Sequence, residues 1–326
     1  MPEPPFISVV IPVHNGSATI EPCLAAACAL DYPSFEVIVV DDGSTDGTAS
    51  IIDRFPVRRI SMDVNGGASK ARNAGVRAAK GEFVFFTDAD CVVPPDLLRL
   101  AARAIEEEGR DCVIGGTYKP LAHDHCLLSS FQSVFVNYSE TKYREPDYIA
   151  THAMLLPMSV YRSHEPFDEH FLPILEDVDY CHRLRRAGVR LVMRPELMVG
   201  HIFLFDLWRS LRNAFRKSRW WVTYSLRNKD LLKDSGTASV ELKTDVVLWG
   251  VGMALLAAAA ITGSSWWLVV WAVSLAVNLL VSRGLVRAFL RSGGGVGFAS
   301  ACLLYYLFAY PVPVALGTIR GMLDRP

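Results

Sequence analysis

Residues 83–90 read FVFFTDAD, an apolar run that ends in two carboxylates one residue apart. A buried strand that ends in this way directs Asp88 and Asp90 to the carboxyl edge of its sheet, where open α/β sheets bind ligands. Two such carboxylates suit a hard divalent cation that holds a diphosphate. The stretch therefore predicts a metal site after the strand Phe83–Thr87, with Asp88 and Asp90 as ligands.

Short apolar and β-branched runs alternate with helical patterns around this stretch. The expected helices are Thr19–Leu30, Asp46–Phe55 and Ala68–Lys80, and the expected strands are Ile7–Val13, Val37–Asp41, Val57–Ser61, Phe83–Thr87 and Cys112–Ile114. Near-continuous apolar strands that alternate with helices predict a doubly wound α/β fold with a mostly parallel sheet. A less regular half follows, with Ala153–Pro157, Phe167–Glu176 and a helix from Asp177 to Ala187.

Composition narrows the class of protein. The chain has 326 residues, 51% of them hydrophobic and 21% charged, which is enough for one large core or two smaller ones. A formal net charge of -1 gives no sign of nucleic-acid binding, so we expect no nucleic-acid partner. Seven cysteines without a C-x-x-C pair indicate a reduced setting. The first residues lack a signal-peptide pattern, so we expect the catalytic part to stay in the cytoplasm.

The last third of the chain is far more apolar. Val246–Thr262 and Trp266–Val281 carry no charged residue, and each is close to the roughly 20 residues that span a bilayer core. Helices of a soluble core are the alternative, but the tryptophans at the ends of these segments favour lipid. A third stretch, Phe298–Ile319, contains two prolines, so it could kink or re-enter, but we expect it to be a third span.

Charge flanking these segments sets the expected orientation. Arg283, Arg287 and Arg291 follow the second segment, which by the positive-inside rule returns the chain to the cytoplasm. We therefore expect a multi-pass protein of the plasma (inner) membrane with a cytoplasmic catalytic domain. Its expected domains are a catalytic part (1–202), a basic amphipathic interfacial segment (203–244) and a membrane part (245–326).

Five short motifs, in this order, resemble the signature of family 2 glycosyltransferases. They are Ser8–Asn15, Val39–Asp46, Ala71–Gly75, Asp88-Ala89-Asp90 and Glu176-Asp177, and the resemblance covers about Ile7 to His201. The resemblance implies an inverting enzyme of the GT-A fold that uses a nucleotide-diphosphate-sugar and Mn²⁺ or Mg²⁺.

The residues and the resemblance agree on a donor site. His14, Asp41, Asp42, Asp88 and Asp90 follow the ends of expected strands, which brings them to one crevice. By resemblance, Pro12 and Asp41 line the nucleotide base pocket and Arg72 approaches the base or phosphates. The resemblance also implies that Asp88 lies near the ribose and the metal and that Asp90 is a direct metal ligand.

Two histidine-containing segments are further metal candidates. By resemblance, His201 completes the metal site and favours manganese, although a lone histidine is often structural. The run His123-Asp124-His125-Cys126 is better explained as a polar loop near the acceptor than as a metal cluster.

Glu176 and Asp177 open the later helix. Carboxylates at a helix N-terminus can serve only as dipole partners. The functional interpretation makes Asp177 the general base that deprotonates an acceptor hydroxyl, with Glu176 positioning the acceptor or Asp177. Because a phosphate acceptor is already ionised and needs no base, this pair favours a hydroxyl of a lipid or lipid-linked saccharide.

A basic segment rich in aromatic residues precedes the apolar third. Arg216, Arg219 and Trp220 fit the R-x-x-R-W form found in membrane-embedded family 2 members, where it faces diphosphate and acceptor. Interfacial anchoring explains the same composition. The alternative functions that stay open are a polyprenyl-phosphate glycosyltransferase and a pseudoenzyme that acts as a membrane scaffold.

Overall fold

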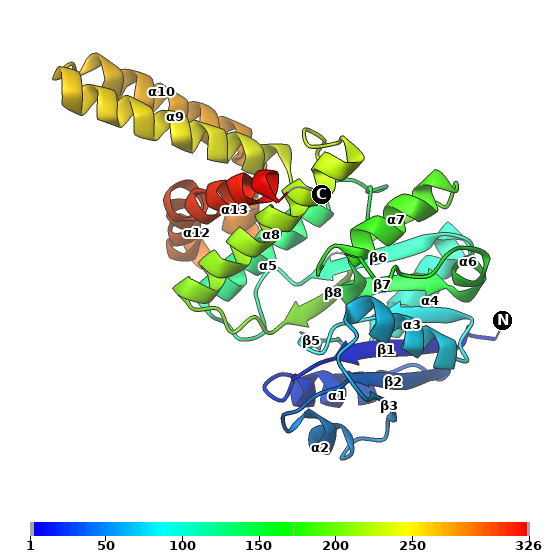
Figure 1. Ribbon diagram of the computed structural model, residues 1–326. Coiled ribbons are helices and arrows are strands. Elements are labelled where there is room, and N and C mark those ends of the chain that lie inside the picture. Colours follow the sequence, from blue (N-terminus) through cyan, green and yellow to red (C-terminus); the bar gives the residue numbers. More distant parts are fainter. Residues whose placement is uncertain (1–2, 172, 325–326) are drawn as a thin grey trace. The chain divides into compact units, whose positions relative to one another are not determined.

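The computed structural model describes residues 3–171 and 173–324, which form two compact units (Figure 1). Unit 1 holds the residues up to Asp124 and Glu140–Phe203, and unit 2 holds His125–Ser139 and the residues from Leu204 onward. The expected domain limits at residues 1 and 326, and residue 172 of the expected segment Phe167–Glu176, lie outside the described residues.

Unit 1 is built on one mixed sheet. Across the described residues this sheet has eight strands in the order β3-β2-β1-β4-β7-β6-β8-β5. Their bounds are β1 Ile7–Val13, β2 Phe35–Asp42, β3 Arg58–Met62, β4 Phe83–Phe86, β5 Cys91–Val92, β6 Val113–Tyr118, β7 Met154–Pro157 and β8 Leu191–His201. The connecting helices are α1 Ile20–Cys28, α2 Thr48–Ile52, α3 Ala68–Ala78, α4 Leu97–Glu108, η1 Thr151–Ala153, α6 Met158–Ser163 and α7 Glu176–Arg186.

The expected α/β fold is confirmed, with one refinement in the sheet. β1 pairs in parallel with β2 and β4, and every residue of β4 is buried. β7 then runs antiparallel between β4 and β6, which makes the sheet mixed. The expected helix Asp46–Phe55 begins only at Thr48, because the Asp46 carboxylate accepts hydrogen bonds from the backbone N–H groups of Thr48 and Ser17 and so belongs to the preceding loop.

The short strand β5 was not expected from the sequence, and it positions the end of β8. It pairs antiparallel with β8, placing Cys91 opposite His201. The backbone N–H of Ile202 also donates to the Asp90 carbonyl at 2.8 Å. These bonds bring the segment after β4 to a residue that lies more than a hundred positions later in the chain.

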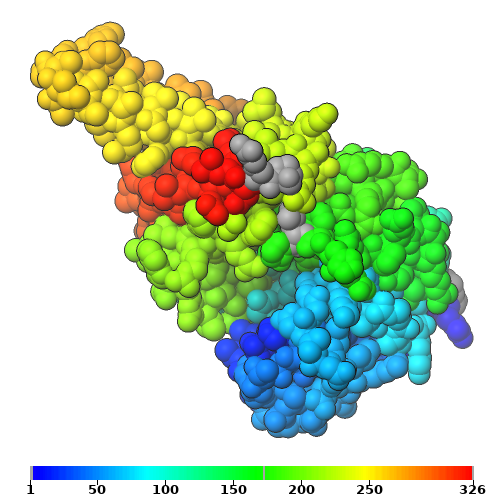
Figure 2. Space-filling model, viewed as in Figure 1, coloured from blue at the N-terminus to red at the C-terminus, as the bar shows by residue number. Residues whose placement is uncertain are grey.

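Unit 2 is helical. Its elements are α5 Leu127–Glu140, which falls in this unit up to Ser139, α8 Leu207–Asn228, α9 Val240–Thr262, α10 Trp266–Val281, α11 Arg283–Arg291, α12 Gly295–Leu304, η2 Tyr305–Ala309 and α13 Pro311–Leu323. α9 and α10 pack side by side as a hairpin (Figures 1 and 2). Inside it, Asn278 donates a hydrogen bond of 2.6 Å to the buried carboxylate of Asp245.

Within the described residues, two helices are long and apolar enough to cross a membrane. These are Val240–Thr262 and the continuous helix Gly295–Leu323. α10 has only 16 residues and reaches that length only together with α11, at a bend of 63°. The helix Gly295–Leu323 tolerates Pro311 because η2 is a π-helical turn, in which the Tyr310 N–H bonds to the Tyr305 carbonyl.

Two glycines allow α13 to lie directly on α8. A Cβ atom at Gly317 would be 2.1 Å from Ser218 Oγ and 2.4 Å from the Phe215 carbonyl oxygen. One at Gly321 would be 2.4 Å from the Arg219 carbonyl oxygen. Glycines four residues apart bring helix backbones together in this way in membrane proteins.

We predict that Gly317→Ala lowers the stability of unit 2 by about 1–3 kcal/mol, because the added methyl group forces α8 and α13 apart. Gly250→Ala in α9 is the matched control, since its Cβ would meet no atom within 4 Å. Alanine is the better helix former, so the control is expected to be neutral or stabilising. Thermal unfolding in detergent measures both, and equal melting temperatures would contradict the prediction.

Candidate active site

A cleft of about 440 Å³ in unit 1 gathers side chains from the ends of several strands. Its walls come from the loop after β1, the end of β2, the start of α3 and the segment after β4. Six of the predicted site residues line it: Pro12, His14, Asp42, Arg72, Asp88 and Asp90.

Asp41 and Asp42 both hold backbone loops. The two carboxylate oxygens of Asp42 accept hydrogen bonds from the Gly66 and Gly67 N–H groups at 2.7 and 2.8 Å, which fixes the entry to α3. Asp41 is buried and accepts a hydrogen bond from the Ser44 N–H, and it is not among the described residues that line the cleft. Both carboxylates thus shape the cleft, and their contact with a nucleotide stays a prediction.

His14 is exposed at the rim of the cleft, in a defined tautomer. Its Nδ1 lies 2.8 Å from the Asp42 carbonyl oxygen, which can only accept a hydrogen bond, so Nδ1 carries the proton. Its Nε2 then accepts a hydrogen bond from the Asn15 side-chain amide at 3.1 Å. The imidazole is therefore oriented by groups of the loop in which it lies and of the neighbouring strand.

Arg72 lies at the centre of the polar wall. Its guanidinium is almost fully buried and donates to Glu176 Oε1 at 2.5 Å and to Asp88 Oδ1 at 3.1 Å. Burial alone would lower the pKa of Arg72, but the charges of Glu176 and Asp88 outweigh it and raise that pKa above its ordinary value. One cation thus joins the start of α7 to the segment after β4.

Asp177 follows in the first turn of α7 and is oriented by backbone groups. Its carboxylate accepts hydrogen bonds from the N–H groups of Val178 at 2.9 Å and Thr151 at 3.3 Å. Burial, together with the charge of Glu176, raises the pKa of Asp177 to about 6. Leu175, directly before this turn, has a positive φ of 76°, a strained conformation for leucine. A carboxylate with a pKa near neutrality is suited to proton transfer.

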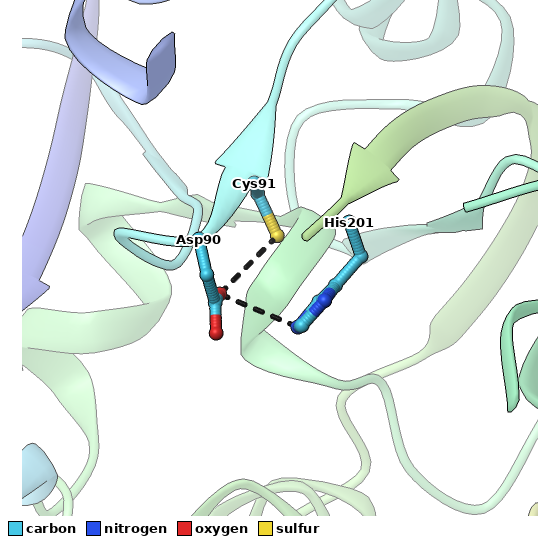
Figure 3. A group of neighbouring side chains, drawn as sticks. All are labelled: Asp90, Cys91 and His201. Carbon is cyan, nitrogen blue, oxygen red and sulfur yellow. Dashed lines mark hydrogen bonds and ion pairs between the residues drawn. The ribbon is translucent and has the colours of Figure 1, made fainter. Parts of the chain in front are cut away.

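The candidate metal site combines Asp90, Cys91 and His201 (Figure 3). His201 Nε2 lies 3.3 Å from Asp90 Oδ1, and Cys91 Sγ lies 3.9 Å from the same oxygen. Partial burial and the charge of Asp88 raise the pKa of Asp90 to about 7. An oxygen and a nitrogen donor beside a second carboxylate fit a divalent cation, whose charge would relieve the repulsion between Asp88 and Asp90.

Sequence reasoning missed Cys91, because a lone thiol beside two carboxylates has no ligand spacing to indicate it. Among the described residues, the groups of three or more candidate metal ligands amount to this one cluster, and it does not contain His123–Cys126. The backbone N–H of His123 instead donates to the His201 carbonyl at 2.9 Å.

Sequence reasoning also missed a buried polar pair, Glu140 and His152. Glu140 Oε2 lies 3.3 Å from His152 Nε2 and accepts a hydrogen bond from the Thr117 hydroxyl. Burial opposes charge on His152, but the Glu140 carboxylate raises the pKa of this histidine. The Tyr118 ring stacks on His152 at 3.9 Å and meets the edge of His201 at 4.7 Å. The Phe203 ring stacks on His201 at 3.7 Å, so Tyr118 and Phe203 together orient the His201 imidazole.

Arg216, Arg219 and Trp220 lie on α8, in unit 2. The Arg219 guanidinium lies 4.8 Å from the centre of the Trp220 ring, and its Nε donates to Asp324 at 2.5 Å. Arg216 is exposed. The contact of these side chains with diphosphate or acceptor stays a prediction.

The sequence matches two family profiles. Residues 8–154 match "Glycosyl transferase family 2", and residues 83–315 match "Glycosyl transferase family group 2". The second match covers more than half of the chain and extends through both units.

Curated relatives in the comparison are also named as glycosyltransferases. Glycosyltransferase GlyG of Streptococcus pneumoniae is 35% identical over 118 residues, which are 35% of this chain and 39% of GlyG. Glycosyltransferase AglE of Haloferax volcanii is 27% identical over 242 residues, which are 66% of this chain and 80% of AglE. The chain therefore spans well under two thirds of GlyG and most of AglE.

A solved structure confirms the expected GT-A-type fold. Mannosyltransferase PcManGT from Pyrobaculum calidifontis, in complex with GDP-Man and Mn²⁺, superposes with a TM-score of 0.68 at 19% identity. The match covers 98% of this chain and 88% of PcManGT. At 19% identity, this similarity is evidence for a shared fold only.

We predict that Arg72→Met lowers the free energy of unfolding by about 3–5 kcal/mol, because it leaves two carboxylates near each other without their buried partner. Arg77→Met on the same helix is the matched control. Arg77 is 60% exposed and lies 3.8 Å from Glu169, so its loss is expected to cost less than about 1 kcal/mol. Urea unfolding of both variants measures the difference, and a similar small loss in each would refute the role given to Arg72.

Proposed function

The chain belongs to the glycosyl transferase family group 2, and from this premise we propose that it is a membrane-anchored, inverting glycosyltransferase. It moves a sugar from a nucleotide-diphosphate-sugar to a hydroxyl of a lipid or lipid-linked saccharide at the cytoplasmic face of the plasma (inner) membrane. One observation carries this proposal. The pairing of Arg72 with both Asp88 and Glu176 supports it, because Glu176 directly precedes the candidate base Asp177 and Asp88 belongs to the candidate metal and diphosphate site.

The donor end of the site accounts for the leaving group. Breaking the bond between sugar and diphosphate leaves negative charge on the diphosphate, and a bound Mn²⁺ or Mg²⁺ would supply positive charge there. Asp90 and His201 would hold the ion, with Asp88 and Cys91 beside it. The start of α3, at Gly67 and Ala68, also lines the cleft, and helix N-termini suit phosphate.

The acceptor end centres on Asp177. With a pKa of about 6, its carboxylate is ionised at neutral pH, yet basic enough to accept a proton from a hydroxyl as that oxygen attacks the sugar. Attack from the face opposite the diphosphate inverts the anomeric configuration. Glu176 is bonded to Arg72, so it fixes the start of α7 and thereby the position of Asp177. An acceptor phosphate would need no such base, which favours the hydroxyl acceptor.

The membrane placement rests on unit 2. Two of its described helices are long and apolar enough to cross a bilayer, and Arg283, Arg287 and Arg291 follow the α9–α10 hairpin. By the positive-inside rule these arginines lie in the cytoplasm. We also propose that the chain has three functional parts. These are a catalytic domain (residues 1–202), a basic interfacial segment (203–244) and a membrane domain (245–326).

We predict that Asp177→Asn lowers kcat by about 10²–10⁴-fold, because the amide cannot accept the proton of the acceptor. Asp179→Asn on the same helix is the control, since Asp179 pairs with Arg183 one turn later. In the wild type, kcat/KM should fall below about pH 6 as Asp177 becomes protonated, and this decline should be absent from the residual activity of Asp177→Asn. An Asp177→Asn enzyme with more than about a tenth of normal activity would exclude Asp177 as the base.

We predict that Asp90→Ala removes the manganese-dependent part of nucleoside-diphosphate binding. A ligand at a hundred times its Kd stabilises the protein by about 2.7 kcal/mol, so thermal shifts with and without Mn²⁺ detect the loss. Asp96→Ala, an exposed carboxylate at the start of α4, is expected to bind as the wild type does.

Three results would redirect the proposal. A manganese-dependent shift of normal size in Asp90→Ala would refute the metal site. Loss of the shift with an unchanged cellular phenotype would favour a scaffold over an enzyme. A product cleaved by mild acid would indicate a glycosyl phosphate, and so a polyprenyl-phosphate acceptor.

A further inference from the structure

The cluster of Asp90, Cys91 and His201 offers one oxygen, one sulfur and one nitrogen donor, and these atoms all lie within 4.8 Å of one another. Asp90 Oδ1 is 3.3 Å from His201 Nε2 and 3.9 Å from Cys91 Sγ. Figure 3 shows the three side chains directed toward one another. Tetrahedral zinc, with its usual bond lengths, separates such donor atoms by about 3.3–3.6 Å. The three atoms therefore already lie close to the arrangement of a zinc site.

The backbone holds the sulfur and nitrogen donors in place. Cys91 and His201 face each other in the antiparallel pair of β5 and β8, so their side chains lie on the same face of the sheet. Both residues are buried, whereas the Asp90 carboxylate is 39% exposed and lines the cleft of unit 1. An ion can thus enter from the cleft at Asp90 and reach two donors that are fixed behind it.

The sulfur donor distinguishes this cluster from a site built of oxygen alone. Thiolate ligands favour zinc and similar soft or borderline ions, whereas carboxylate and water suit manganese and magnesium. Three protein ligands that leave a fourth position open are typical of a catalytic zinc ion. The Cys91 thiol, whose hydrogen is directed at Asp90 Oδ1, would lose its proton to solvent when the ion binds.

We propose that this cluster binds a thiophilic divalent cation, with Zn²⁺ preferred over Mn²⁺, and that the Cys91 thiolate is a ligand. The inference rests on the metal site of the proposed function and deepens it, because it names the class of ion and a further ligand. Asp90 and His201 alone would also suit Mn²⁺. Cys91 is thus the residue that determines the ion preference of the site.

The first test needs only the wild type. The full chain is purified in detergent, freed of metal with a chelator and loaded with one equivalent of Zn²⁺. X-ray absorption at the zinc edge should then show a sulfur ligand at about 2.3 Å beside nitrogen and oxygen ligands at about 2.0–2.2 Å. A zinc shell without sulfur would overturn the inference, and this result does not depend on the folding of any variant.

A variant pair assigns the sulfur to one of the seven cysteines. Cys91→Ser should lose the sulfur ligand and keep the nitrogen and oxygen ligands. Cys112→Ser is the matched control and should keep the sulfur ligand, because the Cys112 thiol is also buried in unit 1 but lies outside the cluster. A sulfur ligand that persists in Cys91→Ser would overturn the role of Cys91.

Competition between the two ions measures the preference. Zn²⁺ binds most nitrogen and oxygen sites more tightly than Mn²⁺, so the change on substitution is decisive rather than the preference itself. The ratio of the Kd for Mn²⁺ to the Kd for Zn²⁺ should fall about ten-fold or more in Cys91→Ser and stay unchanged in Cys112→Ser. An unchanged ratio in a folded Cys91→Ser protein would contradict the inference.

The outcomes for this inference and for the proposed function are separable. Manganese-dependent nucleoside-diphosphate binding by a protein whose zinc has no sulfur ligand would overturn the inference and leave the proposed function intact. A sulfur-bound zinc in a protein that binds no nucleotide would support the inference and count against the proposed function alone.

Discussion

The buried guanidinium of Arg72 is the interaction on which the site of unit 1 depends. Removing a cation from water is costly, and Glu176 and Asp88 compensate that cost from two directions. The three residues come from α3, the segment after β4 and the start of α7, which are separated by as many as 104 positions. Because neither carboxylate can move away without leaving buried charge unpaired, the two ion pairs fix the distance between the segment after β4 and the start of α7.

A second constraint acts at the edge of the sheet formed by β8 and β5. The two-residue strand β5 is too short to be stable alone, but its pairing with β8 places Cys91 opposite His201 and bonds the Asp90 carbonyl to Ile202. The rings of Tyr118 and Phe203 then pack against the His201 ring. The orientation of the candidate metal ligands is thus set by backbone pairing and ring stacking, while Arg72 sets the position of Asp88. Two independent parts of the fold thus position Asp88 and Asp90, which lie one residue apart in the sequence.

Sequence reasoning predicted the elements whose pattern is local. The apolar runs of β1 and β4 and the acidic pair Asp88 and Asp90 were predicted because each is complete within a few residues. β7 was expected as a segment but not as an antiparallel strand, since strand direction depends on the path of the chain. Cys91 and the pair of Glu140 with His152 were missed, because their meaning lies in partners far along the sequence. The contact of Asp42 with a nucleotide stays a prediction, and the bonds of its oxygens to Gly66 and Gly67 are contacts that residue type alone does not reveal.

The basic helix α8 shows why counting charges on a segment does not assign its function. Arg219 is paired with Asp324, within the same helical contact that Gly317 and Gly321 make possible. Lys217, two residues earlier, lines an apolar cavity of unit 2, and Arg216 is exposed. Three cations in four residues therefore meet a carboxylate, an apolar cavity and solvent. A cation bonded to a carboxylate serves the packing of α8 on α13, whereas an exposed cation such as Arg216 does not, so the environment of each side chain decides its role.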